Sequence, residues 1–186
     1  MLTRNLLKQT LICFIVFFTF FLSACKESRE KMIEKIIAGE AKLFGTVSPQ
    51  LNDSLAKSVF DSYMNYADSY SQDSMSAEYL FKAADLSLGM KNPEKSIELL
   101  QRITVEYPEH FKTPMAAFMI GFVYETGLND KEKAKVHYKQ FVEKYPDDKL
   151  AGAAQASYEQ IESGLSDEEL IQMFERQQDT TVSGAM

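Results

Sequence analysis

The segments SIELLQRITVEYP (residues 96–108) and AKVHYKQFVEKYP (residues 134–146) decide the fold, because they repeat one pattern 38 residues apart. Both segments end in Tyr-Pro, and both carry packing-type residues 12, 8 and 5 positions before the proline. Three shared offsets and a shared terminal dipeptide indicate an internal repeat. The residues at these offsets are Ser96, Leu100 and Ile103 in the first segment, and Ala134, Tyr138 and Phe141 in the second.

A third copy of the pattern lies upstream. Val59, Tyr63 and Tyr66 precede Tyr70-Ser71 in the same order, and only the proline is missing. From residue 48 onward the apolar spacing is helical, no segment alternates as a strand would, and helix breakers recur at regular intervals. The sequence therefore predicts an all-α fold, a short solenoid of helical hairpins with about two full repeats, flanking half repeats and a closing helix.

This arrangement resembles the tetratricopeptide repeat, a helix pair of about 34 residues with small residues where the helices touch. The resemblance covers roughly residues 49 to 165 and implies that Ala84 and Gly121 allow two helix backbones to approach closely. The resemblance rests on matching residues in the first helix of each of two successive repeats. They are Leu80, Ala83, Ala84 and Ser87 in one repeat, and Ala117, Ile120, Gly121 and Tyr124 in the next.

The chain departs from the family pattern in several places. It contains no tryptophan, Ser96 replaces the usual alanine, and Asn129-Asp130 lengthens one turn. The repeats are also longer than the plain repeat of about 34 residues. The longer units and the Tyr-Pro endings are similar to the periplasmic branch of the family, which includes the outer-membrane β-barrel assembly lipoprotein and the repeat domain of the Tol-Pal-associated protein. The resemblance is specific for fold and only suggestive for function.

Capping residues in the sequence also predict where several helices begin and end. Asn92-Pro93 opens one helix, Asn129 or Asp130 opens another, and Gly164 ends a third. Ser166 and Glu169 form a capping box that predicts a closing helix over residues 166–178. We therefore expect a repeat domain at residues 49–178 and a flexible tail at residues 179–186.

The first 24 residues are typical of a secretory signal peptide. Arg4 and Lys8 precede a stretch that is apolar from Leu11 to Leu22 except for Thr19, too short for the roughly 20 residues that span a bilayer. The four residues Leu22, Ser23, Ala24 and Cys25 resemble the bacterial lipobox. The resemblance implies that the Cys25 thiol receives a diacylglycerol, that residues 1–24 are removed, and that the new amino end is acylated. The alternatives are a permanent membrane helix and a leader cut elsewhere, with Cys25 incidental.

Lipidation at Cys25 would place the protein in the cell envelope. Two or more acyl chains hold a protein stably on a membrane. Lys26 is not the aspartate associated with inner-membrane retention, so family analogy favours the outer membrane, facing the periplasm. Residues 25–48 then form a lipidated tether with a short amphipathic helix, broken near Gly39 or Gly45. This segment could pack on the body, lie against the membrane or serve as a plain spacer.

Composition excludes several classes of function. Removal of residues 1–24 takes away Arg4 and Lys8, so the net charge falls from −7 to −9. An acidic protein of this kind is not expected to bind nucleic acid, or to bind anionic lipid through a polybasic segment. Cys13 leaves with the leader and Cys25 is acylated, so no thiol remains for a disulfide or a metal. His110 and His137 lie 27 residues apart and fit surface or turn roles better than a metal site. We expect no cofactor and no metal.

Two classes of function remain. No GxSxG, HExxH, phosphate loop or cysteine cluster occurs, and the paired carboxylates stand at helix starts, where they favour the helix dipole. The first class is an adaptor that binds a partner protein or peptide, with outer-membrane or envelope assembly as the role that the family resemblance suggests. The second is an enzyme of envelope carbohydrate or peptide chemistry with unrecognised catalytic carboxylates. The repeat pattern favours the adaptor.

The family register predicts which residues would bind the partner. Side chains one turn away from the packed small residues should face the concavity of the superhelix. Chaperone-binding members of the family hold lysine and asparagine on this surface to clamp a terminal carboxylate, whereas Phe81 and Asp85 stand here, so no such clamp is expected. The predicted partner-binding residues are Glu78, Phe81, Asp85, Met115, Phe118, Phe122 and Glu125.

These residues suit an apolar segment that carries some positive charge. Burial of an aromatic ring contributes about 1.5–3 kcal/mol before ordering costs. The alternative is that the helix at residues 50–70 or the tether helix covers the rings and makes them part of the core.

Overall fold

The computed structural model describes residues 27–45 and 52–164, together with Glu169 and Gln172. All regular secondary structure in these residues is helical, which confirms the predicted all-α solenoid. The helices are α2 (Arg29–Phe44), α3 (Asp53–Ser69), α4 (Met75–Gly89), α5 (Pro93–Glu106), α6 (Thr113–Thr126), α7 (Lys131–Lys144) and α8 (Ala151–Ser163).

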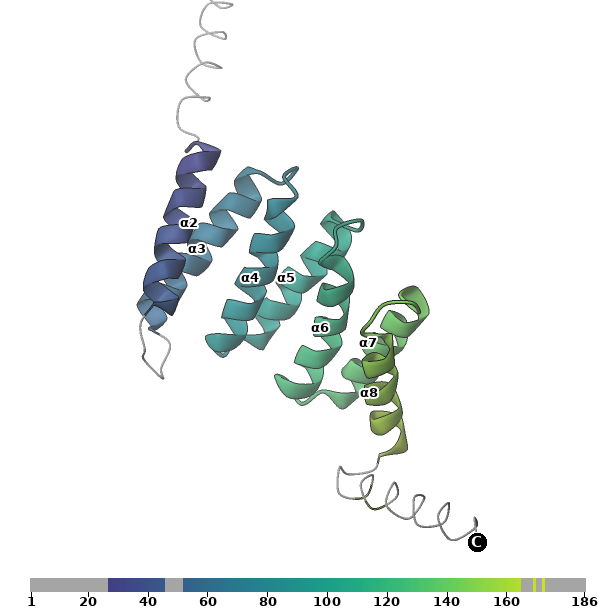
Figure 1. Ribbon diagram of the computed structural model, residues 1–186. Coiled ribbons are helices and arrows are strands. Elements are labelled where there is room, and N and C mark those ends of the chain that lie inside the picture. The colour runs from purple at the N-terminus through teal and green to yellow at the C-terminus, as the bar shows by residue number, and fades with distance from the viewer. Residues whose placement is uncertain (1–26, 46–51, 165–168, 170–171, 173–186) are drawn as a thin grey trace, which may run out of the picture.

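Each helix packs mainly against the helices that precede and follow it in the chain. Successive helices run in opposite directions, so the pairs α2–α3, α4–α5 and α6–α7 stack side by side and α8 follows (Figure 1). As a result, the turns before α4, α6 and α8 lie on the same edge of the solenoid as the start of α2 (Figure 1). We call this edge the turn edge.

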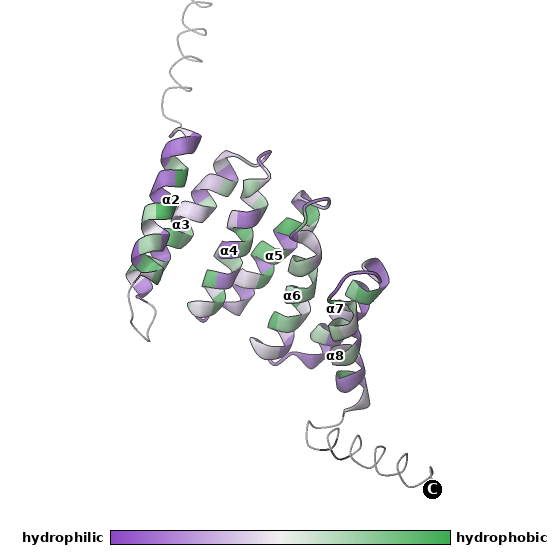
Figure 2. Ribbon diagram, in the orientation of Figure 1, coloured by the Kyte–Doolittle hydropathy of each residue, from purple (hydrophilic) through white to green (hydrophobic). Residues whose placement is uncertain are grey.

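The repeated offsets are the packing positions of the second helices. Every residue at the three offsets is buried in α3, α5 and α7 alike. Figure 2 shows the same division on the ribbon, where apolar residues follow the helices, most densely along α6, and polar residues fill much of the turns. The buried residues are Val59, Tyr63 and Tyr66; Ser96, Leu100 and Ile103; and Ala134, Tyr138 and Phe141.

The small residues of the first helices sit at close contacts, as the register predicted. A Cβ atom built on Gly121 would lie 2.9 Å from Cδ1 of Tyr138 in α7. Ala84, the corresponding residue of α4, is 1% exposed. The register assigned from sequence is therefore correct for α6: the side that carries Gly121 packs against α7.

The turn edge is built from one repeated hydrogen-bond pattern. The backbone N–H groups of Met75, Lys112 and Leu150 donate to the side chains two residues earlier, at 3.0, 3.2 and 2.8 Å. The residues that accept are Asp73, His110 and Asp148. In the first two turns a hydroxyl also closes the preceding helix: Ser76 Oγ donates to the Tyr70 carbonyl and Thr113 Oγ1 to that of Tyr107. The turns before α4, α6 and α8 are thus structural copies.

Helix ends follow the sequence signals. The Asn92 side chain accepts a hydrogen bond from the Lys95 N–H, and Asp130, rather than Asn129, caps α7 by accepting from the Lys133 N–H. Gly164 ends α8 with φ of +66°, a left-handed conformation that favours glycine. The predicted closing helix and tail, residues 166–186, lie outside the described residues apart from Glu169 and Gln172.

Helix α2 packs on the repeat body, which is one of the three placements that the sequence allows for this segment. Met32, Ile36 and Leu43 are buried in the core that α3 and α4 share. The helix runs through Gly39, whose added Cβ would lie 3.0 Å from Val59, and ends at Gly45. The α2–α3 pair therefore extends the solenoid to Arg29. This helix lies within residues 25–48, the segment for which the sequence predicts a tether.

Candidate functional site

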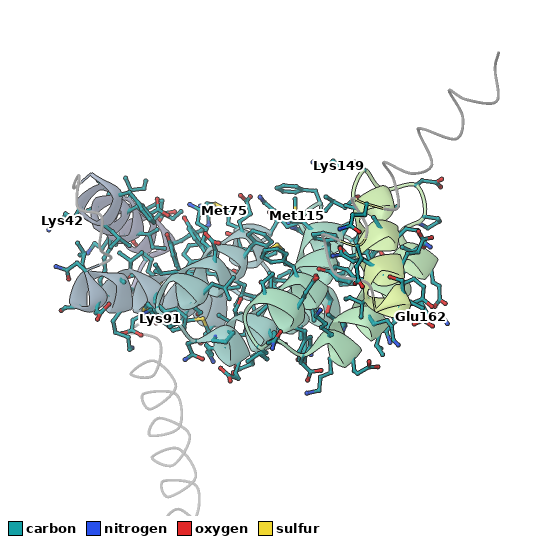
Figure 3. The ribbon with its side chains drawn as sticks, turned by 90° about the horizontal axis from the view of Figure 1, so that it is seen from below. Lys42, Met75, Lys91, Met115, Lys149 and Glu162 are labelled. Carbon is teal, nitrogen blue, oxygen red and sulfur yellow. The ribbon has the colours of Figure 1, made fainter. Side chains whose placement is uncertain are left out.

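The seven residues predicted to bind the partner lie on the sides of α4 and α6 that do not carry the buried packing residues. We call the surface they form the first-helix face. Met75 and Met115, at the starts of these two helices, lie along one long side of the molecule, and Lys91 and Glu162 lie on the other (Figure 3). Met115, the member of the first-helix face that Figure 3 labels, therefore lies on the side of the molecule opposite Lys91 and Glu162.

The three phenylalanines of the first-helix face differ in burial. Phe118 is partly buried, with its ring centre 5.6 Å from that of Tyr138 and 5.7 Å from that of Phe141. Phe81 is partly buried against the core that α2 to α6 form together. Phe122 is 39% exposed. Phe118 therefore contributes to the core between α6 and α7, whereas Phe122 offers its ring to solvent.

The acids of the first-helix face also differ. Asp85 is exposed and Glu78 is half-buried. The Glu125 carboxylate instead accepts a hydrogen bond of 2.7 Å from the Tyr138 hydroxyl of α7. Burial, together with this hydrogen bond and the nearby carboxylate charge, raises the pKa of Tyr138. Glu125 thus ties α6 to α7, and Asp85 is the acid most accessible to a partner.

Two lysines border the first-helix face, and sequence reasoning did not single them out. The Lys82 ammonium pairs with the Glu40 carboxylate at 2.8 Å and so links α2 to α4. The Lys112 ammonium lies 5.0 Å from the ring centre of Phe81 and 5.6 Å from that of Phe111. Both are favourable distances for cation–π contact. The face therefore has local positive charge beside its rings as well as acids.

Several exposed apolar residues were also missed. Ile37 and Phe44 on α2 are 58% and 66% exposed, and Phe111, in the turn before α6, is 70% exposed. The helical spacing of Ile37 and Phe44 was a usable signal. Phe111 carried none, because a single phenylalanine in a turn between two prolines, Pro108 and Pro114, has no periodic context.

Other carboxylates are tied to tyrosine hydroxyls. Glu40 accepts from Tyr63 at 2.8 Å, and Asp73 accepts from Tyr66 at 2.8 Å and from Arg29 Nε at 2.5 Å. Burial is the main cause that raises the pKa of Tyr66, to about 12. Burial opposes ionisation of Asp73, but the hydrogen bonds from Arg29, Met75 and Tyr66 outweigh it and lower the pKa of the carboxyl. These carboxylates join helices to one another.

The two histidines have structural contacts. His110 Nδ1 accepts the Lys112 N–H at 3.2 Å, and the His137 ring stacks on Tyr124 with centres 5.1 Å apart. Burial lowers the pKa of His137. In residues 27–45 and 52–164 no three candidate ligands of the His, Cys, Asp or Glu type come together as a metal would require.

Cys25 and the lipobox residues Leu22, Ser23 and Ala24 lie outside the described residues. Of the helices that the structure describes, none combines the length and the apolar character needed to cross a bilayer.

Residues 78–110 and 115–148 match the family described as tetratricopeptide repeat. The two matches coincide with the α4–α5 and α6–α7 pairs and the turns that follow them. No curated protein matches the chain. Tetratricopeptide repeats support a role as a scaffold for protein–protein interaction. The described part of the chain is an all-α helical solenoid of the tetratricopeptide-repeat type.

Proposed function

We propose that the protein is a lipid-anchored adaptor of the bacterial cell envelope that binds a partner protein or peptide through the first-helix face. The exposure of Phe122 carries the proposal. A ring that is 39% exposed, on a helix whose opposite side is tightly packed, leaves part of its apolar surface available for contact. Met115 and Asp85 extend the same face along α6 and onto α4.

The chemistry of the face indicates the kind of partner. Phe122 and the accessible parts of Phe81 and Met115 would bury apolar side chains, and Asp85 would attract a basic residue beside them. Repeat solenoids bind extended or helical segments along such surfaces. The partner is therefore a segment with a few apolar side chains and at least one positive charge.

The anchor rests on the lipobox string and its position after an apolar leader. Acyl chains on Cys25 would hold the protein on the membrane, and the branch of the family that it resembles favours the outer membrane facing the periplasm. A role in outer-membrane or envelope assembly is the finer form of the proposal.

The anchor is tested with Cys25→Ser. We expect this variant to lose labelling by radioactive palmitate and to accumulate as an uncleaved or soluble product. Retained labelling, together with membrane association after a carbonate wash, would show that Cys25 is not the lipidation site.

The first-helix face is tested by site-specific photo-crosslinking in intact cells. A photoreactive amino acid replaces Phe122 or Met115, and the matched control replaces Val136 of α7, which is 50% exposed on another helix. We expect one and the same adduct from positions 122 and 115 and none from 136. Equal adducts from all three positions would exclude the first-helix face as the binding site.

A further inference from the structure

The chain is fixed to the solenoid almost from the proposed anchor onward. The Tyr70 hydroxyl donates to the backbone carbonyl of Glu27 at 2.9 Å, and Arg29 Nε pairs with Asp73 at 2.5 Å. Both partners belong to the turn between α3 and α4, which is part of the turn edge. Residues 27–29 therefore bind this edge directly.

Chain geometry then limits how far the turn edge can lie from a membrane. Cys25 precedes Glu27 by two residues, and a fully extended chain spans at most about 3.6 Å per residue, or about 7 Å here. A lipidated Cys25 would thus hold the turn at residues 70–74 at the bilayer surface. This step depends on the anchor in the proposed function.

A second observation concerns the next turn along the same edge. Phe111 is 70% exposed, its ring centre is 4.5 Å from that of His110, and the Lys112 ammonium lies over its ring. Segments that lie at a membrane interface combine an apolar side chain such as phenylalanine, which enters the boundary between headgroups and acyl chains, with a lysine whose ammonium stays in water.

We infer that the turn edge lies against the bilayer, with Phe111 inserted into the interface. The same turn also carries the exposed Glu109, and the chain is acidic overall, so the contact does not depend on anionic lipid. The acyl chains supply the affinity, and Phe111 fixes the tilt of the solenoid on the membrane.

This orientation sharpens the kind of partner that the first-helix face can take. Helix α6 has 14 residues and starts at the turn edge, so it reaches about 21 Å from that edge. Every residue of the first-helix face would then lie within about one helix length of the bilayer. The partner segment is therefore membrane-proximal, such as a stretch that flanks a membrane-embedded domain.

Tryptophan fluorescence tests the orientation, because the natural chain contains no tryptophan. The full-length gene with Phe111→Trp is expressed, and the lipidated protein is reconstituted into vesicles of phosphatidylethanolamine and phosphatidylglycerol that contain brominated lipid. The matched control is Phe44→Trp, which is 66% exposed at the far end of α2, about 22 Å from the turn edge.

We expect Trp fluorescence in Phe111→Trp to shift to the blue and to be strongly quenched by the brominated lipid, with little change in Phe44→Trp. Equal quenching of both variants, or no quenching of Phe111→Trp in protein that floats with the vesicles, would overturn the membrane-facing edge and leave the anchored adaptor intact. Protein that carries no palmitate and does not float would overturn both proposals. If Phe111→Trp is unquenched and Phe111→Ser loses the crosslink from position 122, Phe111 contacts the protein partner instead.

Discussion

The pairs α4–α5 and α6–α7 share one backbone arrangement but differ at matched positions in two ways. Inside the pairs, residues change together: Ala84 of α4 corresponds to Gly121 of α6, where the facing helix holds the large Tyr138. On the first-helix face, Asp85 corresponds to Phe122 without any such compensation. At these two positions the packed residue changes together with its neighbour, whereas the exposed residue changes alone. We therefore expect the proposed binding surface to differ between the repeats at exposed positions such as Asp85 and Phe122.

The largest expected difference lies between two rings of one helix. Phe118→Ala removes contacts with Tyr138 and Phe141 and should lower the free energy of unfolding by about 2–4 kcal/mol. Phe122→Ala, one turn further along α6, should cost less than about 1 kcal/mol. Urea unfolding of both variants measures the difference. Equal losses of stability would mean that Phe122 belongs to the core and is not available on the first-helix face to contact a partner.

The second prediction concerns a substitution that gives α6 the residue found at the matched position of α4. Gly121→Ala copies the alanine of α4, yet it should destabilise the protein by about 1–3 kcal/mol, because the new Cβ would lie 2.9 Å from the Tyr138 ring. Combining it with Tyr138→Leu, the residue type at the matched position of α5, should relieve the clash, seen as a favourable coupling energy of about 1 kcal/mol in a double-mutant cycle.

Gly152 of α8 provides the control, because a Cβ at that position meets no atom within 4 Å. Gly152→Ala should raise stability by about 0.5 kcal/mol through helix propensity alone, less than in a helix interior because Gly152 lies in the first turn of α8. If Gly121→Ala and Gly152→Ala shifted stability in the same direction, the close packing of α6 on α7 would be refuted.

A smaller effect concerns the second helices. Ser96 of α5 stands where α7 has Ala134, and within the described residues its buried Oγ has no hydrogen-bond partner. Ser96→Ala should therefore raise the free energy of unfolding by about 1 kcal/mol. Ser87→Ala is the matched control, since that buried hydroxyl donates to the Ala83 carbonyl, and should be close to neutral. A loss of stability in Ser96→Ala would point to a bound water that the hydroxyl holds.

The smallest effect distinguishes the two turns that join the helices within each pair. Lys91 and Asn129 precede the caps of α5 and α7 with φ of 59° and 52°. Asparagine tolerates this left-handed conformation better than lysine. Lys91→Gly should gain about 0.5 kcal/mol and Asn129→Gly less. A larger gain at Asn129, by thermal unfolding, would contradict the strain assigned to Lys91.

Much of the fold was predictable because the repeat samples each packing position more than once. Ser96 and Ala134 alone would be ambiguous, but the shared offsets and the Tyr-Pro ending fixed the helix register. The sequence predicted a short helix in the region of α2 but left its placement open. This helix lacks the Tyr-Pro ending, and its placement depends on contacts with distant residues, such as the bonds from Tyr70 to Glu27 and from Arg29 to Asp73.

The candidate site was only partly predictable for a similar reason. The register indicated which side of α6 faces away from the packed residues, but it could not separate Phe118 from Phe122. Their difference arises from the rings that α7 brings next to Phe118. The role of Glu125 as acceptor for Tyr138 also depends on the approach of two helices, which no local pattern encodes.

The most direct test of the central claim is the dissociation constant of the crosslinked partner for purified protein with Phe122→Ser or Val136→Ser. Both variants replace an exposed apolar residue and should melt like the wild type. We predict that Phe122→Ser raises Kd by about three- to eightfold, because burying the exposed part of this ring, 39% of the residue, contributes about 0.6–1.2 kcal/mol, while Val136→Ser leaves Kd unchanged. An unchanged Kd in Phe122→Ser, with stability intact, would contradict the assignment of the first-helix face as the binding surface.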